Sequence, residues 1–136
     1  MKILSLILYS CSIIYFFVCC SEDQTVSPPT FTGTLANYPD IQAKVFSSCA
    51  SNNCHSTESK KGNLDLTESA AYSNLYNRIS VLYPQFKRVN PGKPAESVLM
   101  LVLRGELLPQ MPINGSIPYA TLDSIESWIK KGALRN

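Results

Sequence analysis

Two cysteines and the only histidine of the chain stand close together, in an order that could hold a metal-containing group. Four residues separate Cys49 from Cys54, and His55 follows directly. Two thiols can add across the two vinyl groups of a haem, and an imidazole next to the second thiol can then face the iron. In the usual attachment motif, two residues separate the cysteines. The order therefore predicts one covalently bound haem c, held by Cys49 and Cys54 with His55 on the iron, across a longer spacer than usual.

The same three side chains allow other interpretations. Cys49 and Cys54 are close enough in sequence to form a disulfide, which would leave His55 as an ordinary residue. A zinc site is weaker, because structural zinc takes four ligands and these residues supply three. Nucleophilic Cys–His catalysis is weaker still, because such pairs normally lie far apart in sequence.

A second iron ligand must come from another part of the chain. Because no second histidine exists, two-histidine ligation within one chain is excluded. Met100 lies inside the apolar stretch 98–103, where we predict that it packs in the core. Met111 lies between Pro109 and Pro112 in a loop, and is the better candidate. Histidine and methionine together fill both axial positions and raise the reduction potential, which is the chemistry of an electron carrier.

The N-terminus reads as an export signal. Lys2 precedes an uncharged, largely apolar run over residues 3–20, and the chain then turns polar. The pattern resembles a bacterial lipoprotein signal over residues 1–19, with Cys20 as the lipidated residue and Cys19 as the alternative. An uncleaved membrane anchor and plain secretion remain open. Each places Cys49 and Cys54 outside the cytoplasm, where free thiols tend to pair. We expect a lipid-anchored protein on the inner or outer membrane, facing the periplasm or the surface.

The rest of the chain predicts a tether over residues 20–38 and one domain over residues 39–136. The net charge of the chain is only +2 and there is no basic run, so nucleic acid is not an expected partner. Apolar residues recur at helical rather than alternating spacing. We therefore predict an all-α domain of about four helices with long loops: one from Pro39 to about Cys49, one capped by Thr67 that carries Ala71, Leu75 and Tyr76, one over Val98–Leu103 after Pro94, and one over 118–131 that ends at Gly132.

The predicted domain resembles a known family through several short motifs. After the cysteine–histidine segment come Gly62-x-Leu64-x-Leu66, then Pro91-Gly92-x-Pro94-x-x-Ser97-x-Leu99, then Met111-Pro112, and finally Trp128-Ile129-x-x-Gly132-Ala133. Their order is similar to that of the small planctomycete-type cytochrome c domains, which belong to the class I cytochrome c superfamily. The resemblance covers residues 39–134.

The resemblance implies a cytochrome c-like fold around one haem. Cys49 and Cys54 would be the thioether anchors, His55 the proximal ligand and Met111 the distal ligand. The expected function is transfer of single electrons between redox protein partners by a monomer. The alternative is a haem-free interaction module, stabilised by a disulfide on the same scaffold. A haem sensor or small peroxidase would follow if Met111 is not a ligand.

Two structural expectations follow from this hypothesis. Without haem, the domain should contain a cavity bordered by His55, Met111 and apolar side chains of the three later helices. Three tyrosines are candidates for its lining, namely Tyr72, Tyr76 and Tyr83. Trp128 is expected in the core.

Overall fold

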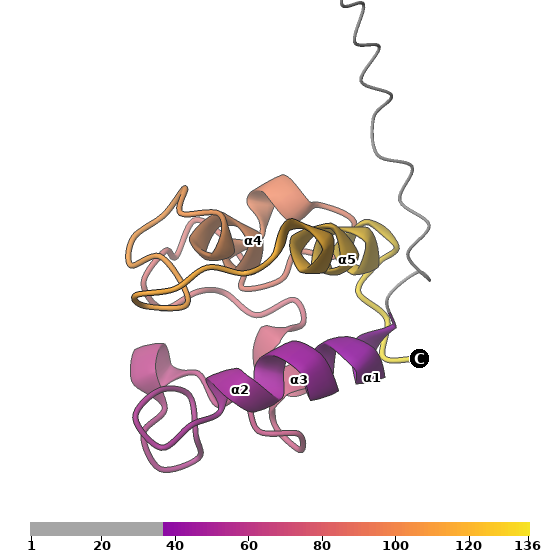
Figure 1. Cartoon of the computed structure of the whole chain (residues 1–136). Coiled ribbons are helices and arrows are strands. Elements are labelled where there is room, and N and C mark those ends of the chain that lie inside the picture. The colour runs from indigo at the N-terminus through magenta and orange to yellow at the C-terminus, as the bar shows by residue number, and fades with distance from the viewer. Residues whose placement is uncertain (1–36) are drawn as a thin grey trace, which may run out of the picture. The chain divides into compact units, whose positions relative to one another are not determined.

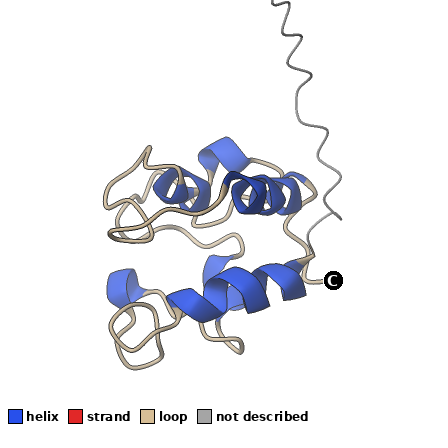
Figure 2. Cartoon of the chain, viewed as in Figure 1, coloured by secondary structure: helices blue, strands red, loops and turns tan. Residues whose placement is uncertain are grey.

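The structure is a computed structural model that describes residues 37–136. These residues belong to one compact unit. They form helices and loops, and no strand occurs among them (Figure 2). The prediction of an all-α domain is therefore confirmed for this part of the chain. Between residues 37 and 136, no helix is long and apolar enough to cross a membrane. The predicted signal segment and the lipidation site Cys20 lie outside the described residues.

The first helix runs without a break into the cysteine–histidine segment. It consists of α1 (Tyr38–Ile41), a π-helical stretch (Gln42–Phe46) and α2 (Ser47–Cys49). The side chain of Asn37 caps its start, because the Asp40 N–H donates to Asn37 Oδ1 over 2.9 Å. The helix ends at Cys49, as the sequence predicted. This element therefore carries the first thiol at its C-terminus.

The next helix, α3 (Ala71–Leu75), is capped differently from the prediction. Thr67 does not cap it with its side chain. Instead, the Thr67 hydroxyl donates to Asp65 Oδ1 over 2.6 Å, and the Thr67 N–H donates to the same oxygen over 2.9 Å. The Thr67 side chain is thereby turned toward Asp65, and the helix begins only at Ala71, with Ala70 before it and no side-chain cap. Only the Thr67 carbonyl serves the helix, by accepting from the Ala71 N–H.

The chain makes a long excursion between α3 and the next helix. Isolated bridges pair Tyr76 with Val89, Ile79 with Lys87, and Lys87 with Ser97. The Leu99 N–H donates to the Arg88 carbonyl over 3.0 Å, so the returning arm of the excursion lies against the start of the next helix. The backbone of Arg88 therefore lies beside the start of the next helix, and its side chain reaches Asn74 in α3.

The last two helices are α4 (Val98–Leu103) and α5 (Tyr119–Lys130). A 3₁₀ turn over Pro94–Glu96 precedes α4. Gly105 and Gly132 follow the two helices with φ of +75° and +96°, the left-handed conformation that favours glycine at a helix end. The predicted positions of both helices are therefore confirmed, with α5 one residue shorter at each end.

The core lies between the helix of α1 and α2 on one side and the pair α4 and α5 on the other (Figure 1). Met100 is fully buried, as expected for a core methionine. Trp128 is 2% exposed, and its indole N–H donates to the Leu134 carbonyl over 2.9 Å. Both core predictions are confirmed. The largest fully buried apolar side chains are Phe46, Leu75, Met100, Ile125, Ile129 and Val89.

Candidate functional site

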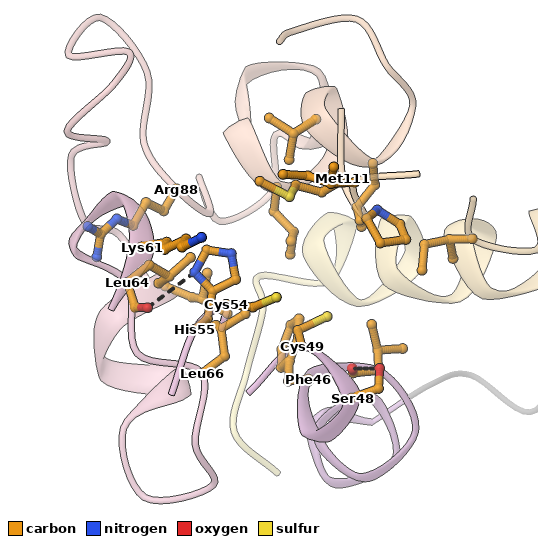
Figure 3. Close-up of a pocket in the computed structure, with 18 of the residues that line it drawn as sticks. Phe46, Ser48, Cys49, Cys54, His55, Lys61, Leu64, Leu66, Arg88 and Met111 are labelled. Carbon is orange, nitrogen blue, oxygen red and sulfur yellow. Dashed lines mark hydrogen bonds between the residues drawn. The ribbon is translucent and has the colours of Figure 1, made fainter. Parts of the chain in front are cut away.

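One pocket brings together all the candidate site residues that the structure describes. Cys49, Cys54, His55 and Met111 all line a cavity of about 280 Å³. In Figure 3, the two cysteines and His55 lie on one side of this pocket and Met111 lies on the other. Two segments that are far apart in sequence therefore face each other across the same space.

The walls of the pocket are predominantly apolar, and their origin differs in part from the prediction. The cavity bordered by His55 and Met111 is present, but α5 contributes nothing to its lining. The first helix contributes instead, and it and α4 each supply four of the lining residues. An open apolar pocket of this kind is the usual setting of a ligand with an apolar body. The apolar wall residues are Val45, Phe46, Leu64, Leu66, Leu75, Val98, Leu99, Val102, Leu103, Pro112, Ile113 and Ile117.

The turn between the two cysteines returns the chain to the end of the first helix. The Cys54 N–H donates to the Ser51 carbonyl over 3.0 Å, and the His55 N–H donates to the Cys49 carbonyl over 3.1 Å. The four-residue spacer is thus folded into a tight loop. The sulfur atoms of Cys49 and Cys54 both point toward the pocket (Figure 3).

The two thiols differ in their surroundings. Both are free in the structure, Cys49 being half-buried and Cys54 exposed. Burial is the main cause that raises the pKa of the Cys49 thiol, so this residue stays protonated at neutral pH. Cys49 is therefore present as the thiol, which is a weaker nucleophile than the thiolate.

The imidazole of His55 is oriented by a backbone carbonyl. Its Nδ1 lies 3.2 Å from the Leu64 oxygen. A carbonyl only accepts hydrogen bonds, so this contact places the proton on Nδ1 and leaves the lone pair on Nε2. This is the arrangement in which a histidine binds a metal through Nε2. The backbone of His55 is also fixed, because its carbonyl accepts from the Leu66 N–H over 2.8 Å.

Residues 62–66, here called the proximal segment, are held by side chains at every carbonyl. His55 binds the central carbonyl, that of Leu64. Polar side chains from three other parts of the fold bind the four remaining carbonyls, so the oxygen that orients His55 sits on a fixed strip of backbone. The other donors are Arg88 to Gly62 and Asn63, Asn74 to Asp65, and Gln42 to Leu66.

Met111 reaches the opposite side of the pocket from a loop. Its N–H donates to the Val102 carbonyl over 2.9 Å, which ties the loop to α4. The side chain is partly buried and packs against the hydrophobic core. Pro112 and Ile113 follow it along the pocket wall. This loop therefore forms part of the pocket wall.

Two cations lie at the pocket, and sequence reasoning missed both. Lys61 and Arg88 are lining residues, whereas no Asp or Glu is among the described residues that form the wall. Arg88 belongs to none of the motifs, and it is held at the pocket by its bonds to the carbonyls of Gly62, Asn63 and Asn74.

The three candidate tyrosines do not line the pocket. Tyr72 and Tyr76 stack on each other with ring centroids 5.1 Å apart, and the Tyr72 hydroxyl donates to the Ala133 carbonyl. The Tyr83 hydroxyl donates to the Leu108 carbonyl. The suggestion that they border the cavity was wrong, because each is recruited by a backbone carbonyl or a neighbouring ring elsewhere.

Within residues 37–136, no three His, Cys, Asp or Glu side chains gather into a group that could hold a metal ion by themselves. The zinc interpretation therefore gains no support from the geometry. In comparisons with protein-family models, curated proteins and solved structures, nothing matched this chain.

Proposed function

We propose that this chain is an exported, lipid-anchored monohaem c-type cytochrome that carries single electrons. The observation that carries the proposal is the shared pocket. Both thiols, an imidazole with its Nε2 lone pair free, and a thioether all line one predominantly apolar cavity. These side chains come from two distant segments, and a flat apolar macrocycle with two vinyl groups and an iron matches all four.

The residues present fit such a group. Cys49 and Cys54 would hold it through thioether bonds, and His55 and Met111 would bind its iron from opposite sides. When bound, the haem supplies an iron centre that accepts and releases one electron. The apolar walls of the pocket would keep water away from that iron. Such exclusion, together with the weakly donating thioether of Met111, favours the ferrous state and a high potential.

The two proposed ligands would limit the chemistry of the iron by occupying its coordination positions. If His55 and Met111 both bind the iron, no coordination position would remain for a substrate. The proposal is therefore a carrier and not an oxygenase or peroxidase. The Leu64 carbonyl keeps the Nδ1 proton of His55 in place, which holds Nε2 in the ligating form.

Several residues of the resemblance motifs have a structural reason in this fold. Ser97 is fully buried, and its hydroxyl donates to the Lys93 carbonyl and accepts from the Asn90 N–H. This network shapes the turn before α4. Leu64 and Leu99 line the pocket. Such agreement between motif and role supports a cytochrome c-like fold as the finer description of the all-α domain.

The location and partners follow from the sequence. The apolar run before Cys20 supports export and lipid anchoring to the inner or outer membrane, facing the periplasm or the surface. A lipid-anchored monomer would exchange electrons with redox protein partners in that compartment. Nucleic acid has no place in this proposal.

The test is expression of the full chain with a cytochrome c maturation system, followed by haem staining of a denaturing gel. We expect a haem signal that survives denaturation in the wild type and is lost when Cys49 and Cys54 are both replaced by Ala. A matched control replaces Ser51 and Asn52 by Ala and should keep the signal.

Mass measurement on the same exported protein distinguishes the alternative. An added mass of one haem supports the cytochrome. A loss of two hydrogens, with no haem signal, shows a Cys49–Cys54 disulfide and supports the haem-free interaction module instead.

A further inference from the structure

Arg88 links the proximal segment to α3. Its Nη2 donates to the carbonyls of Asn63 and Gly62 over 2.8 and 3.3 Å, and its Nη1 donates to the Asn74 carbonyl over 3.0 Å. These carbonyls belong to two separate parts of the fold. A planar guanidinium spans them because its donors diverge in a fixed fork.

The backbone that Arg88 holds has an uncommon conformation. Gly62 and Asn63 have φ of +65° and +53°, so two successive residues are left-handed. This region is sparsely populated for a residue other than glycine, and it persists where surrounding contacts impose it. The two Arg88 bonds fall on the carbonyls of these two residues.

The charge of Arg88 is not matched by a carboxylate. None of the ion pairs among residues 37–136 includes it. Burial, with a smaller contribution from Arg78, lowers its pKa. A partly buried cation without a counter-ion is unfavourable. Its three carbonyl bonds are therefore the interactions that keep it in this position.

We propose that Arg88 is a positioning residue for His55. By holding the carbonyls of residues 62 and 63, it fixes the next carbonyl along the chain, that of Leu64, against Nδ1 of His55. The inference rests on the proposed function in one respect, since His55 must be an iron ligand for the orientation to matter for electron transfer. A carbonyl that accepts from Nδ1 makes the imidazole a stronger donor to a metal.

The decisive variant is Arg88→Lys in the full chain. Lysine keeps the positive charge but has no planar fork, so it cannot bind carbonyls on both sides. The matched control is Arg78→Lys, because Arg78 is exposed, makes one bond to the Ser73 carbonyl and does not line the pocket.

Two measurements are made on each variant. Hydrogen exchange of the backbone amides in residues 61–66 reports on the proximal segment and needs no haem. We expect faster exchange in Arg88→Lys and unchanged exchange in Arg78→Lys. The second measurement is the reduction potential of the haem-loaded protein. We expect a higher potential in Arg88→Lys only, because a weaker hydrogen bond to Nδ1 makes His55 a weaker donor to ferric iron.

Unchanged exchange in a folded Arg88→Lys protein would overturn the proposal. Faster exchange with an unchanged potential would also overturn it, because the hydrogen bonds of Arg88 would then have no effect on His55. If Arg88→Lys does not fold, Arg88→Gln is measured in the same way, since its planar amide reaches one side only. A wild-type chain without haem would instead refute the proposed function. The exchange experiment would still test whether Arg88 holds the proximal segment in place.

Discussion

The two sides of the pocket are built in different ways. On the side of His55, every carbonyl of the proximal segment accepts a hydrogen bond from a side chain. On the side of Met111, backbone N–H bonds from Leu107 to Leu101 and from Met111 to Val102 attach the loop to α4, and the Tyr83 hydroxyl donates to the Leu108 carbonyl. Leu108 and Ile113, which flank Met111, are 74% and 63% exposed.

This difference shows how one pocket can combine a fixed imidazole with a thioether on a more adaptable loop. A dense set of side-chain hydrogen bonds allows the imidazole one orientation. A loop with few anchors and exposed apolar side chains opens locally at a lower free energy. We infer that the thioether side is the part of the site that yields first, and that the imidazole side keeps its geometry.

Replacing His55 by Ala breaks the more rigid side and should have the largest effect. We expect complete loss of the haem spectrum, because the chain has no other histidine to take its place. Absorption spectra of the exported protein measure this effect. The control is Asn52→Ala, which lies in the same turn but does not line the pocket. A normal haem spectrum in His55→Ala would contradict the assignment of the proximal ligand.

Replacing Met111 by Ala breaks the more adaptable side, and its effect should be smaller and of another kind. We expect haem to remain attached while the reduction potential falls, because a thioether stabilises ferrous iron. Spectroelectrochemical titration measures the shift. An unchanged spectrum and potential would exclude Met111 as the distal ligand and favour a haem sensor or small peroxidase with open iron.

Met100 is the matched control for Met111, because it is the other methionine of the domain and is fully buried. Met100→Ala should lower the free energy of unfolding by about 2–5 kcal/mol, as for other large-to-small core substitutions, while the ligand spectrum stays that of the wild type. Denaturant titration followed by circular dichroism measures it.

The smallest predicted effect concerns acid pH and the proximal segment. The hydroxyl and N–H of Thr67 lower the pKa of Asp65 below its ordinary value. A carboxyl whose pKa is lowered in the folded state stabilises the fold at pH values above its unfolded pKa of about 3.9. This contribution is lost as the pH falls through the folded pKa. Wild-type stability should therefore fall more steeply in acid than that of Asp65→Asn.

Denaturant titrations at decreasing pH measure this difference, with Asp123→Asn, an exposed residue of α5, as the control. Equal acid dependence in Asp65→Asn and the wild type would show that Asp65 does not strengthen the proximal segment. It would also weaken the contrast between the two sides of the pocket.

Local signals in the sequence predicted the helices and selected four candidate residues that the fold brings to one pocket. The stop signals at Gly105 and Gly132 act through their own backbone conformations, so they can be recognised without the fold. The difference between Met100 and Met111 was also local, because one lies in an apolar helix and the other between prolines. The capping role of Thr67 was predicted wrongly, because its side chain turns back to Asp65 and the helix begins only at Ala71.

Only the tertiary structure decided what surrounds the predicted ligands. It selected the first helix and not α5 for the pocket wall, moved the tyrosines to other partners, and brought Arg88 to the carbonyls of Gly62 and Asn63. A side chain that donates to a backbone carbonyl cannot be predicted from the type of the accepting residue, because every residue carries that oxygen. The sequence alone determined which side chains could bind a haem, whereas the fold determined which backbone atoms hold those side chains in place.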